Sequence, residues 1–165
     1  MKRLILAVLG VALVLFLVIQ LVPYGRNHTN PPVVSEPAWD SAQTEQLARQ
    51  ACFDCHSNET VWPTYSNVAP FSWMLQRHVD EGRQVLNFSE WGMQTGEEEG
   101  EEAEELVETV LEGEMPPASY LPLHPEARLT AAEKDTLAQG LAATAGVSWQ
   151  PGMSLEHGEG EEDDD

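Results

Sequence analysis

The sequence predicts an all-α protein, in which one transmembrane helix precedes a helical domain with long loops. Three observations indicate this class. A long apolar run follows the first three residues, four later segments repeat apolar residues at helical spacing, and no segment alternates apolar and polar residues as a half-buried strand does. The 165 residues are enough for one domain with appendages and too few for two full domains.

The amino terminus predicts a membrane anchor over residues 1–22. Residues 4–22 are apolar apart from Gln20, and a helix of that length spans roughly 28 Å, close to the hydrocarbon thickness of a bilayer. Lys2 and Arg3 place positive charge at the start, so the remainder of the chain is expected across the membrane. No small-residue cleavage pattern follows the run, which favours a retained signal-anchor over a cleaved signal peptide.

The remaining chain divides into three parts. Residues 23–37 are rich in proline and lack a helical period, which predicts an extended spacer that carries the domain clear of the membrane. Residues 38–147 are expected to form the domain. Residues 148–165 end in a dense run of carboxylates with few apolar side chains, which predicts a disordered acidic tail.

The first two helices of the domain are expected on either side of a loop. One covers residues 41–55, where Asp40 and Gln43 have the spacing of a capping box. The other covers residues 70–86, with Pro70 suited to its first turn because proline has no backbone N–H to leave unpaired.

The last two helices are expected on either side of a proline-rich loop. The third covers residues 97–112 and has an apolar stripe on a strongly acidic background. The fourth covers residues 130–145; Thr130 and Glu133 form a second capping-box pattern, and Gly146 is suited to end the helix.

The charge balance excludes one class of partner. Acidic residues number 28 against 8 basic, for a formal net charge of −20. Nucleic acid is therefore not expected as a partner, because phosphate backbones are bound by clustered Lys and Arg. The glutamates between residues 97 and 114 are most simply a solvated helix face. The alternatives are a surface that steers a basic redox partner and an adaptation to high salt.

Residues 52–56 read Cys-Phe-Asp-Cys-His, the C-x-x-C-H pattern of covalent c-type haem attachment. Cysteines three apart on a helical turn point the same way, so Cys52 and Cys55 can bond the two vinyl groups along one porphyrin edge. His56, directly after the second cysteine, is then placed under the ring as the proximal iron ligand. The motif predicts one covalently attached haem c.

Two other functions for the same residues have less support. A redox dithiol at C-x-x-C is typical of a βαβ context, which the helical pattern does not supply. A zinc site would need a fourth ligand, and three ligands within five residues make poor tetrahedral geometry. The chain has only two cysteines, so a site of four thiolates is excluded.

The predicted distal iron ligand is Met115. It lies on the loop before the last helix, 59 residues after His56, and two following prolines limit the entropy lost in holding its sulfur at iron. A thioether is a neutral, soft ligand that raises the reduction potential of haem iron. An open distal site remains an alternative, and the other candidate ligands are Met74, Met93, His78 and His124.

Aromatic and basic side chains can complete a haem pocket. Trp62 and Trp73 are favoured as walls of the pocket, although ordinary core packing explains such residues equally well. Arg77 and Arg83 are scarce cations in an acidic chain, so haem propionates are conceivable partners. A salt bridge to a neighbouring carboxylate on the same helix is the simpler expectation for both.

Six blocks of the chain share a pattern with one known family: residues 51–60, 62–63, 68–73, 87–91, 115–117 and 123–129. They resemble the bacterial haem-binding domain family, small exported monohaem proteins related to cytochrome c, and the resemblance extends over roughly residues 23–141. It implies a cytochrome c-like fold with Cys52 and Cys55 as attachment points, His56 as proximal ligand and Met115 in the matching distal position.

The sequence therefore predicts a single-pass protein of the bacterial cytoplasmic membrane, with a monohaem domain on the periplasmic side. We expect it to exchange single electrons with a redox partner protein. We recognise no set of acid and base residues in the sequence that is typical of an active site, so an enzyme is not predicted. The alternative is a haem-based small-ligand sensor or peroxidase-like protein with an open or labile distal site.

Overall fold

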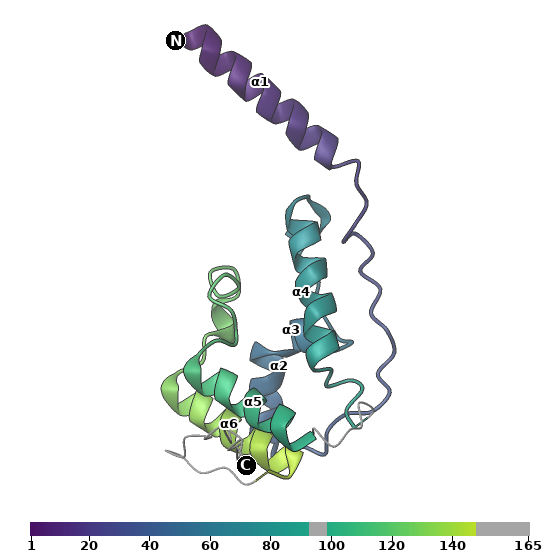
Figure 1. The fold of residues 1–165 in the computed structure, drawn as a ribbon, viewed down its shortest axis with the longest axis vertical. Coiled ribbons are helices and arrows are strands. Elements are labelled where there is room, and N and C mark those ends of the chain that lie inside the picture. The colour runs from purple at the N-terminus through teal and green to yellow at the C-terminus, as the bar shows by residue number, and fades with distance from the viewer. Residues whose placement is uncertain (93–98, 148–165) are drawn as a thin grey trace, which may run out of the picture. The chain divides into compact units, whose positions relative to one another are not determined.

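The computed structural model describes residues 1–92 and 99–147, without the side chains of residues 99–103 (Figure 1). The predicted tail, residues 148–165, lies outside the described residues. Within them the all-α prediction is confirmed: the chain forms six α-helices and two 3-10 helices, and the only strand-like pairing is an isolated bridge between Ser35 and Glu90.

The chain divides into two compact units, which are described separately below. Unit 1 comprises residues 1–36 and 53–91, and unit 2 comprises residues 37–52 and the chain from residue 92 onward. The boundary between Cys52 and Phe53 falls inside the C-x-x-C-H motif.

Unit 1 contains the apolar first helix and the helices that follow the motif. The first helix, α1 (Lys2–Ile19), is long and apolar enough to cross a membrane, and none of its side chains is buried. The others are α3 (Phe53–His56), the 3-10 helix η1 (Thr64–Asn67) and α4 (Phe71–Val85). Helices α3 and α4 pack together within the unit.

Unit 2 is a small helical cluster with an aliphatic core. Its elements are α2 (Ala42–Ala51), α5 (Glu99–Glu112), the 3-10 helix η2 (Pro125–Ala127) and α6 (Ala131–Ala145). Helix α6 packs on both α2 and α5, burying apolar side chains that would otherwise face water. The fully or nearly fully buried members are Leu47, Ala48, Val107, Val110, Leu137, Ala138, Leu141 and Ala142.

Both ends of α6 are capped as the sequence predicts. The side chain of Thr130 accepts a hydrogen bond from the Glu133 N–H while the Glu133 carboxylate accepts one from the Thr130 N–H, which confirms the capping box. Gly146 ends the helix with φ of 76°, a left-handed conformation that glycine adopts without a Cβ penalty.

The predicted helix over residues 41–55 is wrong in two respects. It is divided at Cys52, whose φ of −119° separates α2 from α3. It is also capped by Ser41, whose side chain accepts from the Thr44 N–H, and not by Asp40. Both residue types cap helices well, so local spacing alone did not distinguish them.

The segment after α1 contains no helix and lies along unit 1. Val34 N–H donates to the Ser89 carbonyl at 2.9 Å, and Trp91 N–H donates to the Ser35 carbonyl at 3.0 Å. Closer to α1 in the sequence, the side-chain amide of Asn30 donates to the Thr60 carbonyl, in the loop after the C-x-x-C-H motif. The segment that the sequence predicts as a spacer is thus hydrogen-bonded to the residues around α3 and α4.

Candidate functional site

The site is built where the four-residue helix α3 packs against α4. A glycine makes that contact: a Cβ placed on Gly82 would lie 2.6 Å from the carbonyl oxygen of Cys55 and 3.1 Å from its Cβ. Only a residue without a side chain lets the two backbones approach this closely. Gly82 therefore sets the distance between Cys55 and α4.

His56, the last residue of α3, is oriented by backbone groups. Its Nδ1 lies 3.2 Å from the Leu86 carbonyl, which can only accept, so Nδ1 carries the proton. That tautomer leaves the lone pair of Nε2 for a metal. Burial lowers the pKa of His56 below its ordinary value, opposed by the Leu86 and Gly82 carbonyls, and so favours the neutral imidazole, the form that can bind a metal.

The backbone of His56 is held as well as its ring. The carbonyl oxygen of His56 accepts a hydrogen bond from the Phe88 N–H at 2.8 Å. The ring of Phe88 stacks between those of Phe53 and Trp91, with centroids 5.3 Å and 5.9 Å away. Phe53 and Phe88 are buried, so the turn that carries the imidazole rests on a packed aromatic stack.

Cys55 is a protonated thiol in this environment. Burial, followed by the Asp54 carboxylate, raises its pKa to about 11, and the Arg83 guanidinium only partly opposes this. Cys52 and Cys55 are not joined by a disulfide. Reactive dithiols have lowered thiol pKa values, so the environment of Cys55 does not favour the thiol-disulfide interpretation.

Cys52 belongs to unit 2, where it caps the carboxyl end of α2. Its N–H donates to the Ala48 carbonyl at 2.8 Å, which continues the helical hydrogen-bond pattern through Cys52. The side chain is half-buried. The first cysteine of the motif thus follows α2 of unit 2 directly, while the second cysteine and His56 belong to α3 of unit 1.

A buried polar network fixes the loop immediately after the motif. The Asn58 amide donates to the Pro32 carbonyl at 2.9 Å and to a Glu90 carboxylate oxygen at 3.0 Å, and its Oδ1 accepts from the Asn87 amide at 3.0 Å. The Asn58 N–H donates to the Ser89 hydroxyl at 2.9 Å. Sequence reasoning did not identify this network, although all its members except Pro32 fall within two of the blocks that carry the family resemblance, residues 51–60 and 87–91.

Arg83 stabilises the same loop, and within the described residues its hydrogen bonds go to backbone and side-chain oxygens of unit 1 and not to a carboxylate of α4. Its Nε donates to the Ser57 carbonyl at 2.8 Å, and its Nη2 donates to the Asn30 amide oxygen and the Thr60 hydroxyl at 3.1 and 3.0 Å. Arg77 pairs with Glu81 on the surface at 2.6 Å, in line with the simpler expectation. Arg83 is thus a structural cross-link between α4 and the residues after His56.

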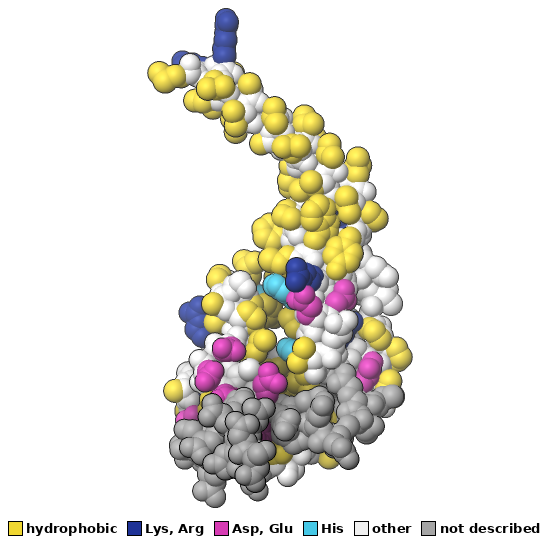
Figure 2. Space-filling view, in the orientation of Figure 1, with side chains coloured by type: hydrophobic (Ala, Val, Ile, Leu, Met, Phe, Trp, Pro, Cys, Tyr) yellow, Lys and Arg dark blue, Asp and Glu magenta, His cyan; other side chains and the backbone are white. Residues whose placement is uncertain are grey.

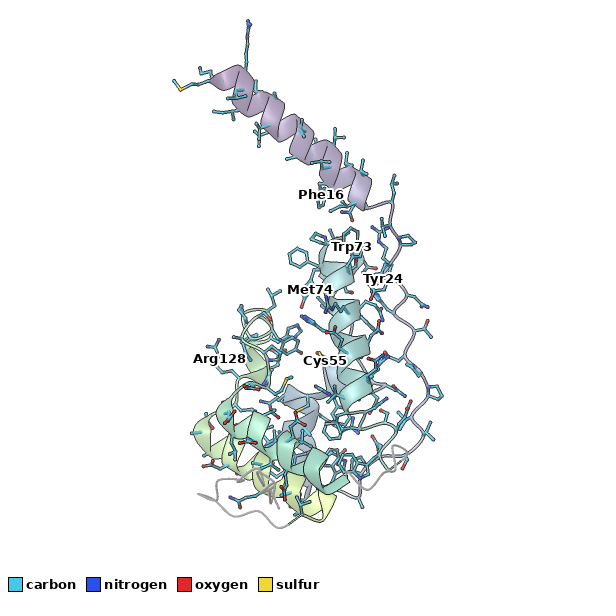
Figure 3. The ribbon with its side chains drawn as sticks, viewed as in Figure 1. Phe16, Tyr24, Cys55, Trp73, Met74 and Arg128 are labelled. Carbon is cyan, nitrogen blue, oxygen red and sulfur yellow. The ribbon has the colours of Figure 1, made fainter. Side chains whose placement is uncertain are left out.

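The two tryptophans predicted as pocket walls have different environments. Trp62 stacks on His28 with a centroid distance of 4.7 Å, and its Nε1 donates to the Asn30 amide oxygen. Trp73 lines an open pocket on α4, and its buried Nε1 has no hydrogen-bond acceptor among the described residues. Figure 3 labels Trp73 and Met74 on α4.

The pocket beside Trp73 follows one face of α4. Its lining residues recur at spacings of three and four, and the same row continues to Gly82 beside Cys55. Two alternative distal-ligand candidates, Met74 and His78, lie in this row. The other residues that line the pocket are Tyr24, Pro70, Arg77 and Glu81.

Met115 lies in unit 2, on the loop after α5. Its N–H donates to the Thr109 carbonyl at 3.2 Å, and its side chain is 37% exposed. His124 stacks on Tyr120 with a centroid distance of 3.9 Å and lies 3.2 Å from the Glu126 carboxylate. Met93 lies outside the described residues. The identity of the distal ligand stays a prediction.

The donor set of unit 1 fits a haem. It provides an imidazole whose tautomer leaves Nε2 for iron, a thiol fixed one residue before it, and a buried indole N–H on the adjoining face of α4 that lacks an acceptor. Among the described residues, no three His, Cys, Asp or Glu side chains gather into a metal-binding group.

Comparison with known proteins agrees with this donor set. A family model described as a haem-binding domain matches residues 14–143. The match includes the C-x-x-C-H motif, the Asn58 network and Met115. No curated protein and no solved structure matches the chain.

Proposed function

The chain belongs to the haem-binding domain family, and we propose that it is a membrane-anchored c-type cytochrome that carries one covalent haem and transfers single electrons outside the cytoplasm. The observation that carries the proposal is the C-x-x-C-H turn, in which the Leu86 carbonyl selects the His56 tautomer that leaves Nε2 for iron. The anchor is α1, with the Lys2 and Arg3 end in the cytoplasm.

Cys52 and Cys55 would hold the haem through thioether bonds to its two vinyl groups. Adding each S–H across a vinyl double bond, with sulfur on one carbon and the proton on the other, would need no oxidant. The raised pKa of Cys55 keeps this thiol protonated and unreactive at neutral pH. Attachment would therefore depend on a dedicated maturation system of the host.

His56 and Met115 are the residues that would hold the haem iron. The bound haem supplies one-electron exchange between ferrous and ferric iron. His56 contributes a neutral imidazole in a fixed orientation, held through its ring by Leu86 and through its backbone by Phe88. Met115 contributes a neutral thioether that stabilises the reduced state and raises the potential.

The redox partner is a protein with a basic surface, and nucleic acid is not a partner. The net charge of −20 supports this assignment, because opposite charge speeds diffusional encounter and selects among partners. No catalytic acid or base is assigned to the chain, which we regard as an electron carrier.

The covalent haem is tested on the full chain produced in a bacterium with a c-type cytochrome maturation system. We expect a pyridine haemochrome spectrum of haem c and the mass of the polypeptide plus one haem. Cys52→Ala and Cys55→Ala singly should change the haemochrome spectrum, because one vinyl group then stays free. A colourless wild-type protein with the mass of the bare polypeptide would contradict the proposal.

The distal ligand is tested by comparing Met115→Ala with Met74→Ala. The wild-type ferric protein should show the weak near-infrared band of thioether-to-iron charge transfer. This band should disappear in Met115→Ala and persist in Met74→Ala, which removes the methionine on the exposed face of α4. Rapid binding of carbon monoxide by the reduced wild-type protein would instead favour a haem-based ligand sensor.

A further inference from the structure

The side chain of Gln20 joins the end of α1 to the start of α4. Its Nε2 donates to the Ala69 carbonyl at 2.9 Å, and its Oε1 accepts from the Ala69 N–H at 2.9 Å. The amide therefore satisfies both backbone groups of one residue, and Ala69 is fully buried. Gln20 is the one strongly polar side chain of the apolar run, so this pairing occurs at the end of the candidate membrane span.

A second contact strengthens the same junction. Gly25 has φ of 72°, and a Cβ on it would overlap the Ser72 carbonyl in the first turn of α4. Arg26 donates from Nη2 to the Gln20 amide oxygen at 3.0 Å. The chain thus turns back onto α4 directly after leaving α1, and no flexible linker separates the two at this point.

Four apolar side chains around this junction face solvent. Leu21 and Val22 follow Gln20 and are 81% and 46% exposed; Val68 and Phe71 flank Ala69 and Pro70 and are 39% and 46% exposed. We call these four residues the apical patch. Figure 2 shows hydrophobic side chains continuing from α1 onto the adjoining part of unit 1. A soluble domain rarely leaves such a cluster open to water without a partner.

A haem attached at Cys55 is not expected to cover this patch. Phe71 precedes Gly82 by eleven residues, about 16 Å of helix, and Gly82 is where α4 contacts Cys55. The patch therefore lies at the end of α4 opposite the attachment cysteine. It adjoins α1, and α1 is already the element with no buried side chain.

We propose that the apical patch lies in the headgroup layer of the bilayer that α1 enters, so that the haem-binding unit touches lipid directly. The inference rests on the proposed membrane insertion of α1. The 18 residues of α1 span about 27 Å, nearly the hydrocarbon thickness, so Gln20 lies at its boundary. The headgroup layer is roughly 6 Å thick on each side, and the Gln20–Ala69 pairing places Val68 and Phe71 within it.

The consequence is a fixed orientation of the site relative to the membrane. With lipid contacts from both α1 and the apical patch, α4 points away from the bilayer, and Gly82 with Cys55 lies at its distal end.

The test is photo-crosslinking of the full chain in phosphatidylcholine–phosphatidylglycerol nanodiscs. p-Benzoylphenylalanine is placed at Phe71, at Val85 or at Leu13 in separate preparations, and lipid adducts are quantified by mass spectrometry. Val85 is the matched control, an apolar side chain of α4 that is 73% exposed at the other end of the helix. We expect adducts at positions 13 and 71, with a several-fold lower yield at position 85.

The three positions separate the possible failures. Adducts at position 13 without adducts at position 71 would overturn the lipid contact and leave the anchor intact. Equal yields at positions 71 and 85 would also overturn it, because the contact would then not be confined to the patch. An absence of adducts at position 13 would show that α1 does not enter the bilayer. It would overturn the proposed anchor and this inference together.

Discussion

Asn58→Leu is expected to destabilise unit 1 by about 3 kcal/mol. Asn58 is 3% exposed, and its amide pairs with Pro32, Asn87 and Glu90 at distances of 2.9 to 3.0 Å. Leucine has a similar size and cannot hydrogen-bond, so it would leave the buried Asn87 amide and the Pro32 carbonyl without these partners. A buried polar group that loses its partner costs more than the hydrogen bond contributed.

The loss is measured by urea unfolding of the full chain in detergent. Asn67→Leu is the control, since Asn67 is exposed and donates only to the nearby Thr64 carbonyl; it should change the free energy of unfolding by less than about 0.5 kcal/mol. Hydrogen exchange should also accelerate at the Val34 and Trp91 amides, which bond across to Ser89 and Ser35. Equal stability of Asn58→Leu and wild type would show that the network makes no net contribution to the free energy of unfolding.

Gly82→Ala is expected to destabilise unit 1 by about 2 kcal/mol and to reduce haem incorporation. The new Cβ would lie 2.6 Å from the Cys55 carbonyl oxygen, a backbone atom that cannot rotate away. Helix α3 must then move from α4, and the Leu86 carbonyl would lose its position opposite the His56 ring. The result would run against helix propensity, because Gly→Ala inside a helix ordinarily stabilises it by about 1 kcal/mol.

The control for this variant is Gln84→Ala on the exposed side of the same helix. It also introduces alanine into α4 but meets no neighbouring backbone, so its stability and haem content should match those of wild type. Haem content per polypeptide is measured by the haemochrome spectrum, and stability by thermal unfolding. A Gly82→Ala protein as stable as Gln84→Ala, with full haem content, would contradict the prediction, because moving α3 away from α4 would then not destabilise the protein.

Local chemistry was sufficient to predict most of the helices. Helix α4 was expected over residues 70–86 and is Phe71–Val85; α6 was expected over 130–145 and is Ala131–Ala145. Apolar spacing and capping pairs act within a few residues, so they are legible in one stretch of sequence. The same holds for the C-x-x-C-H motif, because its three functional residues occupy five consecutive positions.

The features that the sequence did not predict depend on contacts between residues that are far apart in the sequence. Nothing near Asn58 indicates that its amide reaches Pro32 and Asn87, and nothing near Gln20 indicates the pairing with Ala69, 49 residues away. The break at Cys52 is another such case, since the residues of 41–55 are compatible with one continuous helix. The hydrogen bonds that join the predicted extended spacer to the rest of unit 1 are, for the same reason, not predictable from the sequence.

The sequence therefore predicted most of the helices, the C-x-x-C-H motif and the apolar first helix, all of which depend on neighbours along the chain. Only the tertiary structure showed how the His56 ring is oriented, why position 82 has no side chain, and which residues hold the turn after the motif. These features depend on backbone carbonyls and on close approach between helices. Every residue supplies a carbonyl, so residue identity does not reveal which one a side chain will meet after folding.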